Sequence, residues 1–432
     1  MSSLGQPGRR VAIVAGVRTP FARAGTVLKD LSAIELGKRA VAELIQRTEL
    51  EGDLVEAVVY GTVVPSVIAP NIAREVSLMP MLPRGCQAYT VSRACASANQ
   101  AITDAADQIL LGHHHVVIAG GAESLSNVPI LHSRSMSEKL VALSRAKGPA
   151  QQLRILGSIR PRDLVPITPA IAEPSTGETM GQSAEKMAKI NHIPREEQDQ
   201  FALRSHRLAA VGTDDGRLTA EITDVYVPPR FETVVSTDNG IRTDTSIEQL
   251  RALKPVFDKR YGSVTAGNSS PLTDGGSAVL LMSEDRAKTL GYQPLAYIRS
   301  YAYAALDPGE QLLMGPVLAA PVALQRAGLT LRHMDLIEMH EAFAAQVLCN
   351  LRGFESPEWA ERAGFSEPVG EVDRSKLNVM GGSISIGHPF GATGGRILTT
   401  LSNELVRRDG QFGLMTVCAA GGMGHAMVIE RA

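Results

Sequence analysis

The stretch GGSISIGHPFGATGG, residues 381–395, places one histidine, His388, among six glycines and two serines. Glycine carries no side chain, so a ligand or another segment of the chain can approach this backbone closely. A single histidine decides nothing by itself. Its chemistry depends on which other reactive groups the fold brings to it.

Length and composition set broad limits on the protein. A chain of 432 residues suggests two or three domains or one large layered unit. A net charge of -2 gives no indication of nucleic-acid binding. The four cysteines form no CxxC pair, which is typical of a reduced cytosolic protein. We see no secretory signal, lipidation site or apolar run of membrane-spanning length, so we expect a cytoplasmic location.

Short apolar runs alternate with longer amphipathic stretches, which predicts an α/β fold. The runs recur in one order along the chain, and this predicts two similar halves. Residues 11–17 correspond to 295–301, 53–56 to 335–338, 115–121 to 413–422, and 274–284 to 422–431. The stretch around Cys95 likewise corresponds to the stretch around His388. We therefore predict an N-terminal half over 1–121 completed by 273–293, an inserted domain over 122–272, and a C-terminal half over 294–432.

The inserted segment differs in character from both halves. Residues 178–210 predict a helical stretch, and the acidic start at PREEQ is typical of a helix N-terminus. Residues 131–172 hold seven Lys or Arg against Glu138 and Asp163, which gives a net charge of +5 in a chain of -2. Such a basic segment suits an anionic membrane or a partner chain, whereas most charge runs are simply solvated.

Two cysteines lie where strand-like runs end. Cys95 precedes a predicted helix whose buried face would carry Ala98, Ala101, Ile102, Ala105 and Ile109. The positive end of a helix favours a thiolate, so Cys95 is a candidate nucleophile, although a small buried cysteine is an equal alternative. Cys418 precedes glycines that resemble a dinucleotide loop, but no GxGxxG followed by a distant acid is present. In a two-halved fold, Cys95, His388 and Cys418 would converge at one central point.

At this point the chain resembles the thiolase family. The residues that carry the resemblance span nearly the whole chain: CASANQA (95–101), GGAESLSNVP (120–129), MGQSAE (180–185), SVTAGNSSPLTDGGSA (263–278), HEAFA (340–344), GHPFGATGG (387–395) and CAAGGMGHAM (418–427). The pattern is similar to that of the β-oxidation thiolases that form the β-chain of trifunctional fatty-acid oxidation complexes. The resemblance implies duplicated α-β-α-β-α halves with an inserted loop domain.

The resemblance also implies roles for individual residues. Cys95 would take the acyl group as a thioester, His388 would draw off its proton and help hold the oxyanion, and Cys418 would shuttle a second proton. His340 stands where many thiolases carry asparagine; it would donate a hydrogen bond to the thioester oxygen, or be an ordinary core histidine. The backbone amides of Cys95 and Ala420 would form a second oxyanion hole. Coenzyme A and acyl-CoA would contact Ser270, Met180 and Phe343.

The expected activity is CoA-dependent cleavage of 3-ketoacyl-CoA, with no permanently bound cofactor and no metal. The alternatives are a biosynthetic acetoacetyl-CoA thiolase, a ketoacyl synthase that uses a carrier protein, and a non-catalytic acyl-CoA carrier. The resemblance further implies a homo-oligomer and, through 131–172, contact with a hydratase/dehydrogenase α-chain or a membrane surface. We interpret the HHH run at 113–115 as a polar turn and Cys86 and Cys349 as core or loop cysteines.

Overall fold

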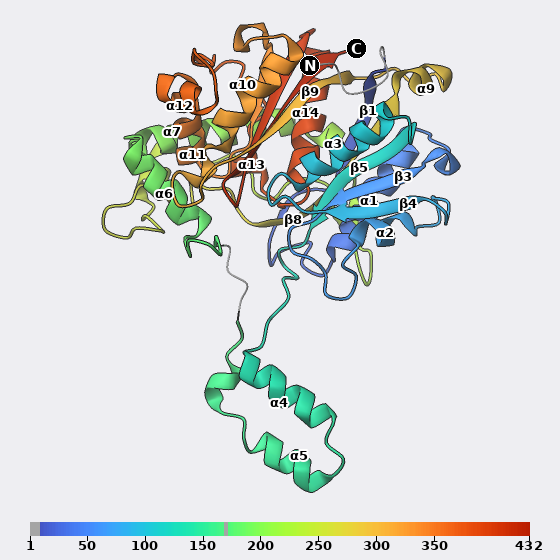
Figure 1. The fold of residues 1–432 in the computed structure, drawn as a ribbon, viewed down its shortest axis with the longest axis vertical. Helices are drawn as coiled ribbons and strands as arrows, with labels where there is room; N and C mark the ends of the chain where they lie inside the picture. Colours follow the sequence, from blue (N-terminus) through green and yellow to red (C-terminus); the bar gives the residue numbers. More distant parts are fainter. Residues whose placement is uncertain (1–8, 168–171) are drawn as a thin grey trace. The chain divides into compact units, whose positions relative to one another are not determined.

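A mixed β-sheet organises the larger of two structural units. The computed structural model describes residues 9–167 and 172–432, and the larger unit comprises 9–127 and 173–432 (Figure 1). Within the described residues the sheet has ten strands in the order β10-β11-β12-β9-β1-β8-β5-β3-β4, with β2 paired to β8. The strands are β1 (Val11–Arg18), β2 (Ala22–Arg23), β3 (Ala57–Gly61), β4 (Gln87–Val91), β5 (Val116–Glu123), β8 (Thr273–Ser283), β9 (Ala296–Ala305), β10 (Leu336–Met339), β11 (Phe412–Ala419) and β12 (Met423–Arg431).

The two halves of this sheet share one pairing pattern. Strand β3 runs parallel to β5, as β10 runs parallel to β11. Strand β8 pairs antiparallel with β5 and β1, as β12 pairs antiparallel with β11 and β9. Strands β1 and β9 join the halves through Val11 and Ile298. The predicted duplication is therefore confirmed at the level of strand pairing.

Helices divide the larger unit into alternating layers. Helices α1 (Ala33–Arg47) and α2 (Ile72–Ser77) cover the outer face of the first half, and α10 (Gly315–Ala327) covers that of the second. Helices α3 (Ser97–Leu110) and α14 (Thr393–Arg407) pack against each other between the halves, in a shared apolar core. The predicted buried face of α3 is confirmed, since its alanines and isoleucines have no exposed surface. Small side chains there allow the helix to lie close to the sheet.

Part of the predicted insert packs within the larger unit. The helical stretch expected over 178–210 is two helices, α6 (Met180–Ile190) and α7 (Arg195–Asp214), followed by α8 (Ile247–Ala252) and the hairpin β6 (Val225–Val227) and β7 (Thr233–Val235). Helix α7 begins with acidic residues in its first turn, as its sequence predicts. The division of the chain at 121, 272 and 294 stays a prediction.

Residues 128–172 form a second unit, of which 128–167 and 172 are described. It contains α4 (Arg134–Ser144) and α5 (Pro149–Leu156), which follow one another in a helical hairpin (Figure 1). Two backbone hydrogen bonds join Leu131 and Ile167, and Lys139 forms an ion pair with Asp163 at 2.5 Å.

Three further helices complete the described fold: α9 (Glu284–Thr289), α11 (Ala344–Phe354) and α12 (Pro357–Arg362), with the short α13 (Ser383–Ile386) before His388. Among the described residues, every helix is too short or too polar to cross a bilayer.

Candidate active site

Cys95 lies in a tight turn that leads from β4 into α3. Ala94 has a φ of 45°, a left-handed conformation that is costly for alanine. The Ser97 hydroxyl holds this turn, since it accepts from the Arg93 amide at 2.8 Å and donates to the Ala94 carbonyl at 2.6 Å. The strain and the hydroxyl clamp fix the direction in which the Cys95 side chain leaves the backbone.

His388 lies between α13 and α14, in a loop that packs closely against the first half. A side chain at Gly391 would lie 2.8 Å from the Gly61 carbonyl oxygen and 3.0 Å from that of Ala122. One at Gly394 would collide with Asn99 of α3, and one at Gly395 with Ser277 of β8. Of the two explanations for the glycines, the structure supports close approach by another chain segment. These three glycines admit the first half of the chain, and they do not open space for a ligand.

Glu123 at the end of β5 ties this glycine-rich loop to the first half. Its carboxylate accepts hydrogen bonds from the amides of Val63 at 2.9 Å, Val64 at 3.1 Å and Gly391 at 3.0 Å, and from the Thr62 hydroxyl at 3.1 Å. Burial raises the pKa of Glu123 to about 7, against the effect of these donors. One buried carboxyl group therefore anchors the segment that carries His388.

His340 follows β10 and faces His388. Its amide donates to the Thr416 carbonyl at 2.9 Å, which fixes the backbone against β11. Its Nδ1 lies 3.0 Å from the Ser383 hydroxyl, and its ring centroid lies 4.2 Å from that of His388. His340 has no exposed surface, so both its ring and its partners are fixed by packing.

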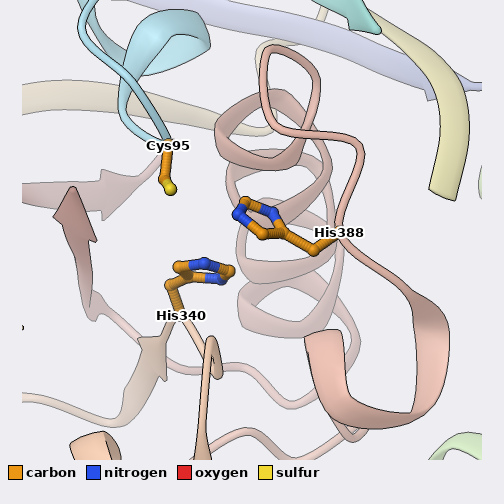
Figure 2. A group of neighbouring side chains, drawn as sticks. All are labelled: Cys95, His340 and His388. Carbon is orange, nitrogen blue, oxygen red and sulfur yellow. The ribbon is translucent and has the colours of Figure 1, made fainter. Parts of the chain in front are cut away.

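The fold brings Cys95, His340 and His388 together. Figure 2 shows the three side chains pointing toward one another, and one ligand atom from each lies within 4.8 Å of the other two. Burial, together with the charge of nearby Arg396, lowers the pKa of His388 to about 3 and that of His340 well below its usual range. Both imidazoles are therefore neutral at physiological pH.

The thiol of Cys95 is protonated in the resting site. Burial raises its pKa to about 11, and the amides of Ala420 and of Cys95 itself lower it as hydrogen-bond donors to the sulfur. The expected help from the helix end is thus outweighed by the loss of water around the thiol. Formation of the thiolate requires a neighbouring base.

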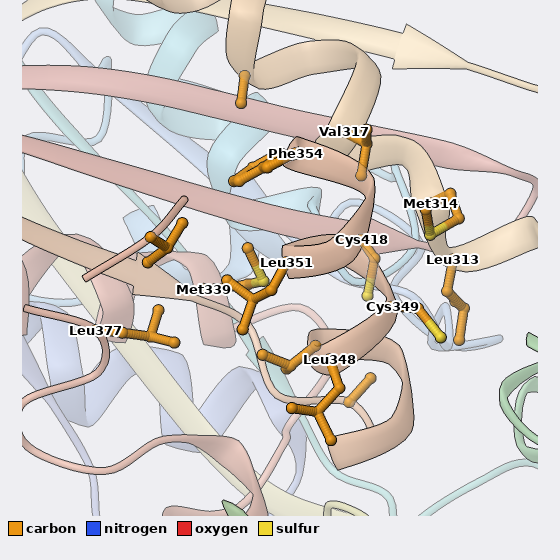
Figure 3. Close-up of a cluster of buried hydrophobic side chains, with 14 of the residues drawn as sticks. Leu313, Met314, Val317, Met339, Leu348, Cys349, Leu351, Phe354, Leu377 and Cys418 are labelled. Carbon is orange, nitrogen blue, oxygen red and sulfur yellow. The ribbon is translucent and has the colours of Figure 1, made fainter. Parts of the chain in front are cut away.

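Cys418 lies at the end of β11 in a buried cluster that also contains Met339 and Leu348 (Figure 3). It lies close enough to Cys95 for a charge on that sulfur to raise its pKa, which burial already holds well above the usual range. Ala420 follows in the turn to β12, where the positive φ values belong to Gly421 and Gly422. Alanine at position 420 therefore carries no backbone strain of that kind.

Cys86 and the histidine run have contacts separate from those of Cys95, His340 and His388, whereas Cys349 shares an apolar cluster with Cys418. Cys349 is buried in α11 within the same apolar cluster, and Cys86 is buried against the α1 and α2 layer. In the HHH run, His113 Nδ1 lies 2.8 Å from Gln108 Oε1 at the end of α3. Among the described residues, the group of metal-ligating side-chain types close enough to share an ion is Cys95, His340 and His388.

The three predicted substrate contacts differ in how closely they approach this cluster. The Ser270 amide donates to the Ala342 carbonyl at 2.9 Å, and the His388 amide donates to the Pro271 carbonyl at 3.2 Å. The segment of Ser270 thus lies between the His340 and His388 loops. Phe343 precedes α11 and packs edge to face on Phe257 with centroids 6.1 Å apart, and Met180 is the first residue of α6. Both Phe343 and Met180 pack on the apolar core that contains Cys418.

Four buried polar residues of the site were not singled out from the sequence. They are Ser383, which contacts His340; Thr393, which contacts His388; Arg396, which contacts Ser383; and Glu123. Ser383 and Thr393 lie inside the His388 stretch, five residues before and five after the histidine. Their equal spacing on either side of His388 was the sequence signal that could have identified them.

Comparison with known proteins agrees with this geometry. A thiolase N-terminal domain matches residues 11–285, and a thiolase C-terminal domain matches residues 292–431. This chain belongs to the thiolase family.

Individual thiolases are similar over nearly the full chain. A 3-ketoacyl-CoA thiolase of Pectobacterium atrosepticum is 51% identical over 98% of this chain and 97% of its own. The structure of human mitochondrial 3-ketoacyl-CoA thiolase in complex with CoA has a TM-score of 0.82 and 32% identity over 98% of both chains. Bacillus anthracis acetyl-CoA acetyltransferase has a TM-score of 0.83 and 34% identity, and covers 100% of both chains.

Proposed function

We propose that this thiolase cleaves 3-ketoacyl-CoA with coenzyme A, giving acetyl-CoA and a shortened acyl-CoA through an acyl-Cys95 intermediate. The observation that carries the proposal is the meeting of Cys95, His340 and His388 within 4.8 Å, with Cys418 next to Cys95. The similar enzymes of Pectobacterium atrosepticum and human mitochondria bear the name of this activity.

In the first half-reaction, His388 accepts the Cys95 proton as the sulfur attacks the 3-keto carbon. The bond between C2 and C3 breaks, and its electron pair passes to the acetyl-CoA carbanion. Cys418 protonates that carbanion, and its raised pKa keeps it protonated until this step. The products are acetyl-CoA and the acyl thioester on Cys95.

In the second half-reaction, the Cys418 thiolate takes the proton of the incoming CoA thiol. The CoA sulfur attacks the acyl carbon, the bond to Cys95 breaks, and His388 returns its proton to Cys95. Hydrogen bonds from His340 and His388 would hold one oxyanion, and the amides of Cys95 and Ala420 would hold the other. Every proton is returned, so the cycle needs no permanently bound cofactor.

The chemistry proposed here is nucleophilic, although Cys95, His340 and His388 are all of metal-ligating types. The guanidinium charge of buried Arg396 disfavours protonation of both imidazoles. A divalent cation between the rings would meet the same repulsion. We therefore propose no metal at this site.

Ser270, Met180 and Phe343 are our proposed contacts for the pantetheine and acyl parts of the substrate. Ser270 has the strongest support, because its segment lies between the His340 and His388 loops. Met180 and Phe343 are supported by their position at the edge of the core that contains Cys418.

We further propose a cytoplasmic homo-oligomer. Strand β4 ends the described sheet and carries partly exposed residues, so its outer edge suits pairing with a second copy. The four free cysteines suit a reducing compartment.

The segment 131–172 is our proposed contact for a hydratase/dehydrogenase α-chain or a membrane surface. Leu153 and Leu156 of α5 are 69% and 47% exposed. Five of the seven cations, including Arg145 and Arg154, form no ion pair among the described residues. Exposed leucines beside free cations suit an anionic amphipathic surface.

Incubation with acetoacetyl-CoA and CoA, followed through the loss of enolate absorbance, tests the proposed activity. We expect turnover by the natural protein and loss of at least a thousandfold in Cys95→Ser, because the hydroxyl is a poorer nucleophile. Equal activity in the variant would remove Cys95 from its role. Absence of activity in both proteins would favour the non-catalytic carrier.

A ladder of 3-ketoacyl-CoA chain lengths separates the remaining alternatives. Turnover that extends to long chains is the expected result for a degradative thiolase. Turnover restricted to acetoacetyl-CoA would favour the biosynthetic enzyme, and a requirement for malonyl-carrier protein would favour the synthase.

A further inference from the structure

Each histidine of the site has one ring nitrogen that lacks a hydrogen-bond partner in the described part of the chain. The Nε2 atoms of His340 and His388 are buried and have no hydrogen-bond partner among residues 9–167 and 172–432. A neutral imidazole carries its proton on one nitrogen, and the group bonded to Nδ1 decides which nitrogen this is. The hydrogen-bond partner of Nδ1 therefore determines whether Nε2 of each ring can donate or accept a hydrogen bond.

The Nδ1 partner of His340 is the Ser383 hydroxyl, whose proton has one available acceptor. Ser383 Oγ lies 3.0 Å from His340 Nδ1 and accepts from Arg396 Nη2 at 3.2 Å. A guanidinium group only donates, so the Ser383 proton cannot point to Arg396. Within the described hydrogen bonds, the acceptor left for that proton is His340 Nδ1. The ring proton of His340 then lies on Nε2.

Arg396 is itself buried beside an acidic side chain. It is 1% exposed, lies on α14, and its Nη1 is 3.5 Å from Glu338 Oε2 on β10. Burial raises the pKa of Glu338 to about 8. This contact links the helix that follows His388 to the strand that precedes His340, so the donor to Ser383 comes from a buried part of the fold.

The Nδ1 partner of His388 is the Thr393 hydroxyl, which accepts a hydrogen bond from the ring where Ser383 donates one. Thr393 Oγ1 lies 2.7 Å from His388 Nδ1 and donates to the Pro389 carbonyl oxygen at 3.2 Å. A carbonyl only accepts, so the Thr393 proton is engaged there and its oxygen accepts from Nδ1. The lone pair of His388 then lies on Nε2.

We propose that Ser383, oriented by Arg396, is a positioning residue that keeps the ring proton of His340 on Nε2, while Thr393 keeps that of His388 on Nδ1. The site then presents one donor and one acceptor beside Cys95. The acceptor takes the thiol proton, and the donor meets the thioester oxygen. This inference rests on the proposed function for its catalytic meaning and on the hydrogen-bond pattern alone for the two tautomers.

Steady-state thiolysis of acetoacetyl-CoA by the full-length protein tests the catalytic part. Ser383→Ala removes the donor to His340, and we expect kcat to fall about tenfold to a hundredfold with KM changed less than threefold. Ser385→Ala is the matched control: it removes a buried hydroxyl from the same short helix, where Ser385 contacts Ser205 and no histidine. We expect near-natural kcat from Ser385→Ala and partial recovery from Ser383→Thr. Equal kcat in the two alanine variants would overturn the positioning role.

Nitrogen NMR of the resting protein, labelled at histidine, tests the tautomers without any turnover. Signals are assigned from His340→Asn and His388→Asn. We expect a protonated Nε2 in His340 and a protonated Nδ1 in His388, and loss of the first pattern in Ser383→Ala but not in Ser385→Ala. The same tautomer in both rings, or an unchanged His340 signal in Ser383→Ala, would overturn the inference. Failure of thiolysis in the natural protein would instead count against the proposed function.

Discussion

The chemistry of the site depends on two histidines that are alike in burial and charge but have different hydrogen-bond partners. His340 and His388 are both buried, both neutral and 4.2 Å apart between ring centroids. The serine beside one ring and the threonine beside the other make them unequal. The activity of a His340 variant should therefore depend on whether its new side chain can still donate a hydrogen bond.

We predict that His340→Asn retains more activity than His340→Ala. The asparagine amide can still donate toward the thioester oxygen, so we expect kcat for acetoacetyl-CoA thiolysis to fall about tenfold. Alanine supplies no donor, and loss of one oxyanion contact costs about 10²–10³ in kcat. Steady-state kinetics of both variants measure the difference. Equal losses would show that His340 acts through something other than its N–H group.

Sequence reasoning brought Cys95 and His388 together because their turns are equivalent points of a repeat, and it added Cys418 because that residue ends a strand-like run in the second half. The structure confirms that meeting in space, while their roles stay proposals. Ser383 was missed although it lies five residues before His388, and Arg396 was missed because its importance comes from a contact between α13 and α14, which no local pattern encodes. The raised pKa of Cys95 was also missed, since a helix start is visible in sequence and desolvation of the thiol is not.

At the scale of elements, the loop between α13 and α14 is fixed by contacts with the opposite half. Gly391 meets backbone atoms of Gly61, Thr62 and Ala122. The sequence indicated that a close approach was possible there but left open what approaches. The approaching segment is set by how the ends of β3 and β5 pack against that loop, which depends on tertiary structure and cannot be read from local sequence.

We predict that Gly391→Ala lowers both stability and activity. The added methyl group would lie 2.8–3.0 Å from backbone atoms that cannot move aside. Overpacking of this kind costs about 1–3 kcal/mol and would displace His388. Gly85→Ala is the control, because that position has open space around it. Thermal unfolding and thiolysis assays measure the effect, and an unchanged Gly391→Ala protein would contradict the packing argument.

Glu123 supplies a prediction about pH. Its pKa is about 7 in the folded chain against an ordinary value of 4.5, so the folded state holds an extra proton between these pH values. Stability contributed by this proton is present below pH 4.5 and is lost as pH rises toward 7, by about 1.4 kcal/mol per pH unit.

Glu123→Gln removes that proton equilibrium. We expect the free energy of unfolding of the natural protein, relative to the variant, to decrease by about 3 kcal/mol between pH 4.5 and pH 7. Denaturant unfolding at several pH values measures the difference between the two proteins. A difference that stays constant with pH would show that Glu123 titrates near its ordinary pKa.

At the scale of the whole molecule, residues 128–172 form a separate compact unit whose surface is basic and exposes leucines. Its net charge of +5 over 131–172 was readable from composition, and the sequence placed it within a longer predicted insert, 122–272, that interrupts the first half. Its hairpin of α4 and α5 was not predicted, because two short helices that expose leucines lack a clear buried face.

We predict that the full-length protein sediments with vesicles containing anionic lipid and that binding decreases as salt rises. Each cation near such a surface contributes about 1 kcal/mol, so Arg145→Glu with Arg154→Glu should weaken binding at least tenfold. Arg47→Glu, in α1 of the larger unit, is a control of equal charge change per site. Equal binding by the double variant and the natural protein would favour a protein partner as the occupant of this surface.

The central position of β8 has a consequence for synthesis of the chain on the ribosome. Strand β8 is built from Thr273–Ser283, yet it lies between β1 and β5, which are complete by residue 123. Until it emerges, β1 and β5 have no neighbour to join them, and their apolar edges are exposed. About 150 residues must be translated during that interval, so the nascent first half is the stage at which a chaperone would be needed.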